Sequence, residues 1–305
     1  MRRVLAVHFV PCALFVAVVY ALVRAGSFTG RSDWARAVPS GPTSGVTAFV
    51  VVSVCAAVLG LLLHPFQVRA VRVWEGYWDR WPVTAGLAGM LMEVQRRRRQ
   101  KLGHRAEIVT DAFANGGRVA ADAARRLAAG PPEEALLPTA LGNALRAGEL
   151  SAGERYGLAT LSSWPRIHMQ VSDRLAAVLH SARTDLDASV NLCWSFLASG
   201  TVAMVALYDE PDVRWLPLVA LVLIAVAYKG AVTAAQAYAG LMHIVYDLHR
   251  FDLLEALHHP LPDREHEVET FWRVSESFAG RPDFGLPFDH GRSSDAGDAH
   301  GSTDA

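Results

Sequence analysis

The sequence predicts an all-α membrane protein in which two transmembrane helical hairpins flank a helical cytosolic insert. Three observations indicate this class. The 305 residues are 51% hydrophobic and only 19% charged, whereas an average soluble domain has about 25% charged residues. The apolar residues gather in four long runs whose interiors carry no charged side chain except one lysine. Between these runs, no stretch shows the clear alternation of apolar and polar residues that is typical of strands.

Each of the four runs is long enough to cross a bilayer, because a helix needs about 20 mostly apolar residues to do so. The first hairpin is expected over residues 1–66, with spans at about 4–23 and 46–66, and the second over 188–235, with spans at about 188–208 and 215–235. The first run has an alternative interpretation as a secretory signal peptide. Its 20 apolar residues exceed the about 7–15 of such peptides and favour a span.

The orientation follows from the basic residues that flank the spans, which stay on the cytosolic side. Nine lysines and arginines lie between Pro65 and Arg105, whereas the connection Asp209–Arg214 carries three acids and one arginine. We therefore expect a multi-pass protein of the bacterial plasma membrane with both termini in the cytoplasm.

The remaining chain forms two cytosolic parts. The insert, 67–187, has a charge balance of +4 from 17 basic and 13 acidic residues, and the chain from Asp247 onward has a balance of −8 from 13 acids and 5 arginines. Opposite charges favour contact between them.

Residues 236–280 are expected to be a helical tail, and residues 281–305 a disordered acidic tail. Within the insert we expect a helix over 67–81 that ends before Pro82, helices over 84–104, 106–129 and 166–187, and a turn at Trp164-Pro165.

Several motifs resemble a known family. They are Pro138–Ala147, Glu154–Leu158, Trp164–Arg166 and Tyr246–Leu254, in this order. The chain from Pro138 to Phe278 resembles an uncharacterised family of four-span integral membrane proteins of actinobacteria and cyanobacteria, which has no established activity. The resemblance implies four spans and a cytosolic helical part, and it implies no chemistry.

One charged side chain falls inside a predicted span. Lys229 lies about 21 Å along the helix from Trp215 at 1.5 Å per residue. An ionisable side chain at that depth is a candidate functional site, and Asp187 and Asn191 at the inner end of the third span are its candidate partners. The alternative is structural, because a lysine can extend its ammonium group to the headgroups.

A second candidate is a basic cluster on the predicted helix 84–104. Five of the six residues from Arg96 to Lys101 are cationic: Arg96, Arg97, Arg98, Arg99 and Lys101. Each basic side chain near an anionic leaflet contributes about 1 kcal/mol to binding. The cluster therefore predicts contacts with anionic lipid headgroups, and the alternative is a solvated helix face. A nucleic-acid partner is not expected, since the net charge is −1.

The sequence predicts no enzyme, metal site or cofactor. His243 and Asp247 are four residues apart on one helical face, but no third ligand accompanies them. The three cysteines all fall in apolar runs and act there as small hydrophobic residues.

The expected function is a non-enzymatic membrane scaffold or sensor whose cytosolic helices bind an unknown cytosolic protein. The alternative is a homo-oligomeric ion channel or transporter, because Asn191, Ser195 and Ser199 form a polar stripe on the third span.

Overall fold

The computed structural model describes residues 2–78, 82–107, 114–281 and 287–288. These residues form helices and turns without a strand, and four helical segments are long and apolar enough to cross a membrane: Val7–Ala25, Pro42–Glu75, Asp173–Ala206 and Pro211–Ala256. This confirms the all-α class and the four candidate spans. The predicted disordered tail, 281–305, lies outside the described residues except for 281, 287 and 288.

The chain forms two compact units. Unit 1 contains Met1–Gly148 and Ala177–Gly240, and unit 2 contains Glu149–Ala176 and Leu241–Ala305. The elements of unit 1 before α9 are α1 (Arg2–Ala25), α2 (Trp34–Ala37), α3 (Pro42–Leu63), η1 (His64–Phe66), α4 (Gln67–Glu75), α5 (Pro82–Glu107), α6 (Ala114–Ala128), η3 (Glu133–Ala135) and α7 (Ala140–Glu149). The helices α9 (Asp173–Ala206) and α10 (Leu216–Ala256) contribute residues to both units, and η6 (Pro211–Val213) connects them.

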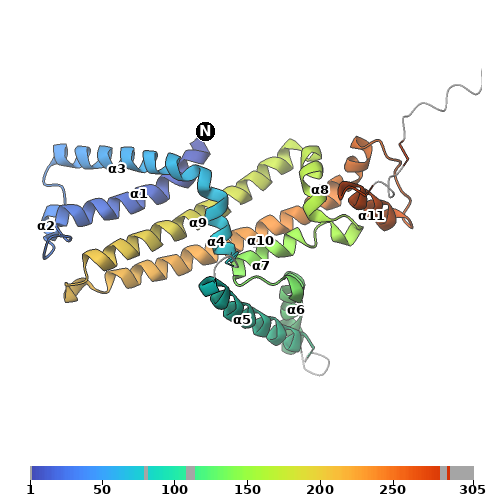
Figure 1. Cartoon of the computed structure of the whole chain (residues 1–305), viewed down its shortest axis with the longest axis horizontal. Coiled ribbons are helices and arrows are strands. Elements are labelled where there is room, and N and C mark those ends of the chain that lie inside the picture. The colour runs from blue at the N-terminus through green and yellow to red at the C-terminus, as the bar shows by residue number, and fades with distance from the viewer. Residues whose placement is uncertain (1, 79–81, 108–113, 282–286, 289–305) are drawn as a thin grey trace, which may run out of the picture. The chain divides into compact units, whose positions relative to one another are not determined.

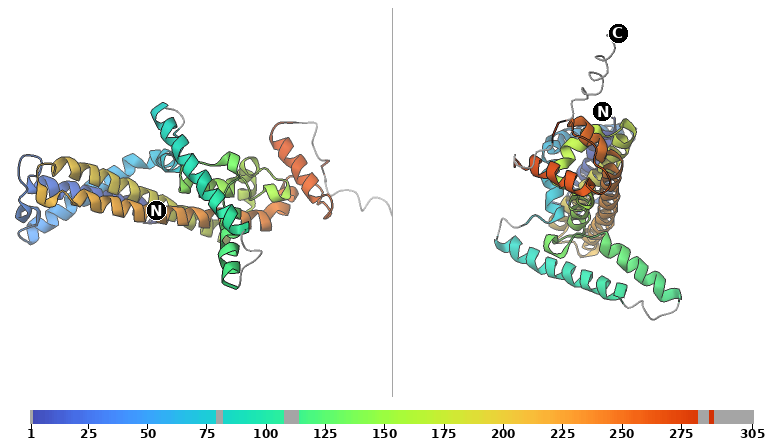
Figure 2. Two further views of the ribbon diagram at one scale, coloured as in Figure 1. Left: turned by 90° about the horizontal axis from the view of Figure 1, so that it is seen from below. Right: turned by 90° about the vertical axis from the view of Figure 1, so that its right-hand side faces the viewer.

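The four long helices α1, α3, α9 and α10 pack side by side in unit 1 (Figure 1 and Figure 2, left). The helix α3 packs against α1 at Gly60, where a Cβ atom would lie 3.5 Å from the Cβ of His8. On the other side, α9 approaches α10 so closely that a Cβ on Gly200 would lie 2.8 Å from the Cβ of Ala220. Small residues permit such close contact between apolar helices.

The helices α1 and α9 run parallel to each other. Asn191 contacts His8 near the beginning of α1, and further along both helices Leu22 packs against Ala203 and Leu207. The partners α3 and α10 each run antiparallel to α1 and α9 (Figure 1). The beginning of the first candidate span therefore lies level with the middle of the third.

A second contact region of unit 1 joins α4 and α7 to the long helices. Leu141 and Leu145 of α7 are buried with Val71, Leu186 and Ala231. The contact is too close for a side chain at Gly142, since a Cβ there would lie 2.1 Å from the Glu75 carbonyl oxygen.

The helix α4 is shorter than the predicted helix over 67–81. It ends at Glu75, because Gly76 takes a left-handed conformation with φ of +97°. Glycine adopts this conformation without the steric cost that other residues meet. The periodic pattern continues to Trp81, so this prediction was wrong about the end of the helix. Residues 79–81 lie outside the described residues.

Unit 2 contains η4 (Glu154–Tyr156), α8 (Thr160–Ile167), η5 (His168–Gln170), the end of α10, and α11 (Glu267–Phe278). The predicted turn at Trp164-Pro165 is wrong, because Pro165 lies inside α8. This proline removes the helical donor to the Leu161 carbonyl. The predicted helix over 166–187 is also interrupted, since Val171 is extended and α9 begins at Asp173.

Candidate functional site: a pocket among α1, α3 to α4, and α9

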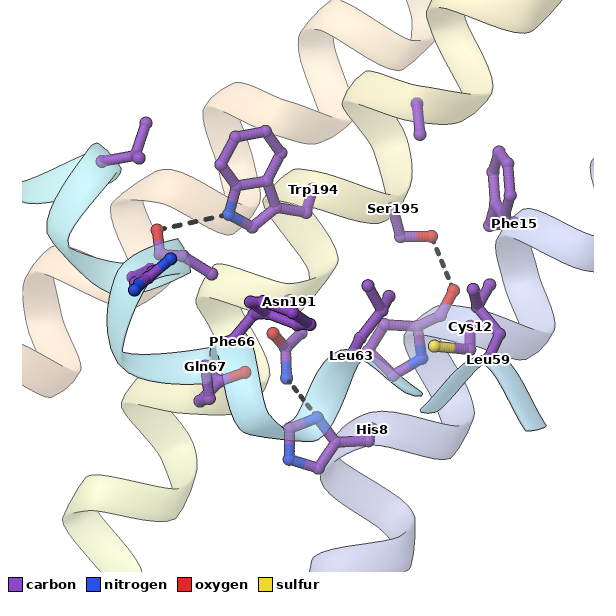
Figure 3. A pocket seen from close by; sticks show the side chains of 15 residues that line it. His8, Cys12, Phe15, Leu59, Leu63, Phe66, Gln67, Asn191, Trp194 and Ser195 are labelled. Carbon is purple, nitrogen blue, oxygen red and sulfur yellow. Dashed lines mark hydrogen bonds between the residues drawn. The ribbon is translucent and has the colours of Figure 1, made fainter. Parts of the chain in front are cut away.

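Unit 1 contains a pocket of about 420 Å³. Side chains from α1, from the continuous stretch α3 to α4, and from α9 surround it (Figure 3). Most of the lining is apolar and includes Phe15, Leu59, Leu63 and Phe66, whereas His8, Gln67, Arg69 and Asn191 provide polar groups. A concave apolar site with a few polar groups is the usual form of a small-molecule binding site.

A chain of three polar side chains connects α9, α1 and the end of α3. The Asn191 Nδ2 atom lies 3.2 Å from His8 Nδ1, and His8 Nε2 lies 3.1 Å from His64 Nδ1. An amide nitrogen can only donate a hydrogen bond, so His8 Nδ1 accepts. Neutral His8 with its proton on Nε2 then donates to His64, and one tautomer satisfies both contacts.

The hydrogen-bond ladder of α1 has a gap at this level, because Pro11 lies inside the helix. A proline has no N–H group, so the Val7 carbonyl one turn earlier loses its donor within the helix. Asn191 Nδ2 lies 3.4 Å from this carbonyl oxygen and replaces the missing donor. One turn further along α9, the Ser195 hydroxyl donates to the Pro11 carbonyl at 2.7 Å. The two polar residues of α9 therefore bind backbone groups of α1 at the interruption.

On the α4 side of the pocket, the side chains of Trp194 and Gln67 provide two hydrogen-bond donors. The indole Nε1 of Trp194 donates to the Ala70 carbonyl at 3.3 Å (Figure 3). In contrast, Gln67 Nε2 is buried and has no hydrogen-bond partner among the described residues. A buried donor without an acceptor costs about 1–3 kcal/mol, and this atom belongs to a side chain that lines the pocket.

The three residues of the predicted intramembrane polar site do not meet one another. Asn191 binds α1, as described above. Asp187 forms an ion pair with Arg183 on its own helix, at 3.4 Å between Nε and Oδ1. Lys229 is exposed, and it makes no ion pair within the described part of the chain. The function of these residues stays a prediction.

The basic cluster on α5 is partly neutralised by acids. Arg96 lies 2.8 Å from a Glu133 carboxylate oxygen, and Arg97 lies 2.8 Å from one of Glu93. The hydrogen bond from Arg97 lowers the pKa of the Glu93 carboxyl. The other three residues of the cluster have different surroundings. Arg99 Nη1 lies 3.4 Å from a carbonyl oxygen of α6, while Arg98 and Lys101 are exposed and make no ion pair within the described ranges.

Unit 2 has a polar cluster of its own, made from the motifs that carry the family resemblance. Asp247 accepts hydrogen bonds from Arg155 and from the Tyr156 hydroxyl, the latter at 2.6 Å. Burial, together with the hydrogen bond to Asp247, raises the pKa of Tyr156. Arg250 lies over the Tyr156 ring at 4.2 Å and forms an ion pair with Glu267 at 2.7 Å. No group of three metal-ligating side chains occurs in the part of the chain that the structure describes.

Sequence reasoning missed His8, His64 and Glu210. The two histidines lie in apolar runs that are free of lysine, arginine and acids, so a search for charged residues passes over them. Glu210 was treated only as a loop acid. It is 8% exposed and accepts hydrogen bonds from the backbone N–H and the hydroxyl of Ser32, at 2.6 and 2.5 Å. The sequence does contain one indication that His8 is functional. It lies three residues before Pro11, and a proline inside an apolar run leaves the carbonyl one turn earlier without its helical donor.

Comparisons of the chain with protein-family models, with curated proteins and with solved structures find no match. The resemblance to the four-span family stays a prediction, and the geometry alone supports a functional assignment.

Proposed function

We propose that this chain is a four-span integral membrane protein of the bacterial plasma membrane, with both termini and the insert in the cytoplasm. It acts as a non-enzymatic scaffold or sensor. The arrangement of α1 and α9 supports the topology. These two helices run parallel, and each has an antiparallel neighbour, so an even number of crossings returns both chain ends to one side of the membrane.

The scaffold or sensor is preferred because the polar residues of α9 bind α1. A channel would direct such residues toward a pore. Here Asn191 and Ser195 bind the backbone of α1, and Ser199 is buried. Interhelical hydrogen bonding accounts for these side chains, and the pocket beside them is a place where a small molecule can bind.

An exposed apolar face on α5 supports the binding of a cytosolic protein. Leu87, Met90 and Val94 are 49%, 63% and 40% exposed and follow one another at helical spacing. Exposed apolar surface of this kind is typical of interaction sites. The basic end of the same helix supports contacts with anionic headgroups, because Arg98 and Lys101 are exposed.

The topology is tested by labelling with a membrane-impermeant thiol reagent in a chain whose three native cysteines are replaced. Ser40→Cys, in the connection between α2 and α3, should react in intact cells. Arg98→Cys, on α5, should react only after lysis. Labelling of Arg98→Cys in intact cells would overturn the orientation.

Partner binding is tested by photo-crosslinking in cells with a photoreactive residue at Met90. Val119 on α6 is a matched control, since it is 60% exposed and lies outside the α5 face. We expect a discrete protein adduct at Met90 and none at Val119. Equal crosslinking at both positions, or no adduct at Met90, contradicts the proposal.

An oligomeric channel is the second candidate, and the exposure of Lys229 favours it. A charged side chain on the outside of a candidate span can be covered by a second copy of the chain. Counting the subunits of the full-length protein in lipid nanodiscs separates the two candidates. A closed ring of four or more copies supports the channel, whereas a monomer or compact dimer supports the scaffold or sensor.

A further inference from the structure

The pocket described above changes from polar to apolar along its length. On α1 the lining begins with His8 and reaches Phe15, and on α9 it begins with Asn191 and reaches Ala198. Both pairs are seven residues apart, or about 10 Å along a helix. The third wall is antiparallel. Its polar residues Gln67 and Arg69 follow His64, which contacts His8, and the wall runs back through Phe66 to Leu59. Each wall therefore has polar groups near the His8 end of the pocket and reaches apolar side chains about 10 Å deeper.

The polar end of the pocket offers hydrogen-bond donors that lack acceptors. Arg69 lines the pocket with an exposed side chain, and no carboxylate of the described residues lies within ion-pair distance of it. The buried Gln67 Nε2 atom is a second donor without a partner in the described chain. Arginine and amide donors suit a phosphate group, which only accepts hydrogen bonds when ionised.

We propose that this pocket binds one anionic phospholipid, with an acyl chain against Phe15, Leu59 and Ala198 and the phosphate at Arg69 and Gln67. The depth agrees with this occupant. Half of a 30 Å hydrocarbon core is about 15 Å, so the pocket covers about two thirds of the chain length available in one leaflet. The arginine lies three residues after the end of the span predicted at about 46–66, where the headgroups of the cytosolic leaflet lie in the proposed topology.

The proposal rests on the four-span topology but not on partner binding. It also differs from the expected headgroup contacts of α5, because the acyl chain as well as the headgroup is bound. An ordinary annular lipid would bind without preference for a headgroup, and a free phosphate would bind without a chain. These two possibilities define the arms of the experiment.

The experiment is native mass spectrometry of the full chain in mild detergent, after incubation with equal amounts of phosphatidylglycerol and phosphatidylcholine. We expect one retained phosphatidylglycerol per chain. Arg69→Gln should lower its occupancy about tenfold, the effect of losing one charged hydrogen bond. Arg72→Gln is the matched control, because Arg72 is exposed on the same helix and does not line the pocket. It should change the occupancy less than twofold.

A second pair of variants tests the acyl chain. Ala198→Phe fills the deep end of the pocket and should abolish retention, whereas Ala225→Phe adds the same bulk at an exposed position of α10 outside the pocket and should leave it intact. If Ala198→Phe does not fold, Arg69→Gln and its control still decide the matter.

Three results would overturn the proposal. They are equal retention of the two lipids, equal loss of occupancy in Arg69→Gln and Arg72→Gln, and retention of inorganic phosphate, added in place of the lipid, at the same occupancy as phosphatidylglycerol. The thiol-labelling experiment reports on the topology independently, so failure of the lipid site and failure of the proposed function are distinguishable.

Discussion

The bond between Asn191 and the carbonyl that Pro11 leaves free predicts a specific energetic coupling between α9 and α1. Asn191 Nδ2 lies 3.4 Å from Val7 O and 3.2 Å from His8 Nδ1. Asn191→Leu removes both contacts and leaves the Val7 carbonyl without a donor in an apolar environment. Interhelical hydrogen bonds in membranes contribute about 0.6 kcal/mol on average and up to about 1.7. An unsatisfied group adds about 1–3 kcal/mol. We expect a total loss of about 2 kcal/mol.

The second substitution of the cycle is Pro11→Ala. Alanine provides the missing backbone N–H, which bonds to the Val7 carbonyl within α1. In this background Asn191→Leu no longer leaves that carbonyl without a donor, and it should cost only about 1 kcal/mol. The expected coupling free energy is therefore about 1 kcal/mol, measured as the difference between the two costs.

Ser195→Ala is the matched control for this cycle. Ser195 lies one turn along the same face of α9 and donates to the Pro11 carbonyl oxygen, which alanine also carries. Its loss should therefore cost the same with either residue at position 11. The assay is the unfolding free energy of the full chain in bicelles. The reasoning is refuted if Asn191→Leu costs the same in both backgrounds. It is refuted equally if Ser195→Ala shows the same coupling, because straightening of α1 would then account for the effect.

Two further pairs of substitutions test close contacts, one pair in each unit. Glu210→Ala should lower the unfolding free energy by at least about 3 kcal/mol, because it removes two hydrogen bonds to a charged group and each contributes about 1.5–3 kcal/mol. Ser32→Ala should cost less, since its backbone N–H still binds the carboxylate, and equal costs would contradict this. Gly157→Ala should unfold unit 2, as its φ is +84° and a Cβ would lie 2.4 Å from the Val268 carbonyl oxygen. Gly280→Ala, with φ of +80° and no neighbour within 4 Å, should cost only the backbone strain of about 1–2 kcal/mol. Circular dichroism melting curves compare the two glycine variants.

The candidate spans were predictable because the bilayer requires an uncharged run of fixed length, and a run of 20 residues is visible without knowledge of any partner. The ends of the cytosolic helices were less predictable. Gly76 ends α4 although the apolar pattern continues, since the left-handed turn brings Gly76 against Pro138, where a Cβ would lie 3.0 Å from the proline Cδ. That contact depends on a residue 62 positions away, which local pattern does not reveal.

The pocket was beyond sequence reasoning for the same reason. Asn191 stands out in the sequence for its polarity inside a span, and pairing by charge alone predicts Lys229 as its partner. The actual partner, His8, is uncharged in the tautomer described above and sits near Pro11. A proline in one span and an Asn–Ser pair four residues apart in another indicate a carbonyl without a donor and two donors available. This combination is the signal that was present in the sequence.

Because the polar residues of α9 bind α1, they also restrict where a pore could lie if the chain forms a ring. Exposing Asn191 and Ser195 to an ion pathway requires breaking their bonds to α1, at about 0.6–1.7 kcal/mol for each bond and with the Val7 carbonyl left without a donor. The exposed face of α10 needs no such rearrangement, and it carries Lys229. In a ring of four or more copies, Lys229→Met should therefore change anion flux into vesicles, whereas Ser195→Ala should leave the flux unchanged. The opposite result would show that α9 leaves α1 in the assembled state, and unchanged flux in both variants would remove Lys229 from any pathway.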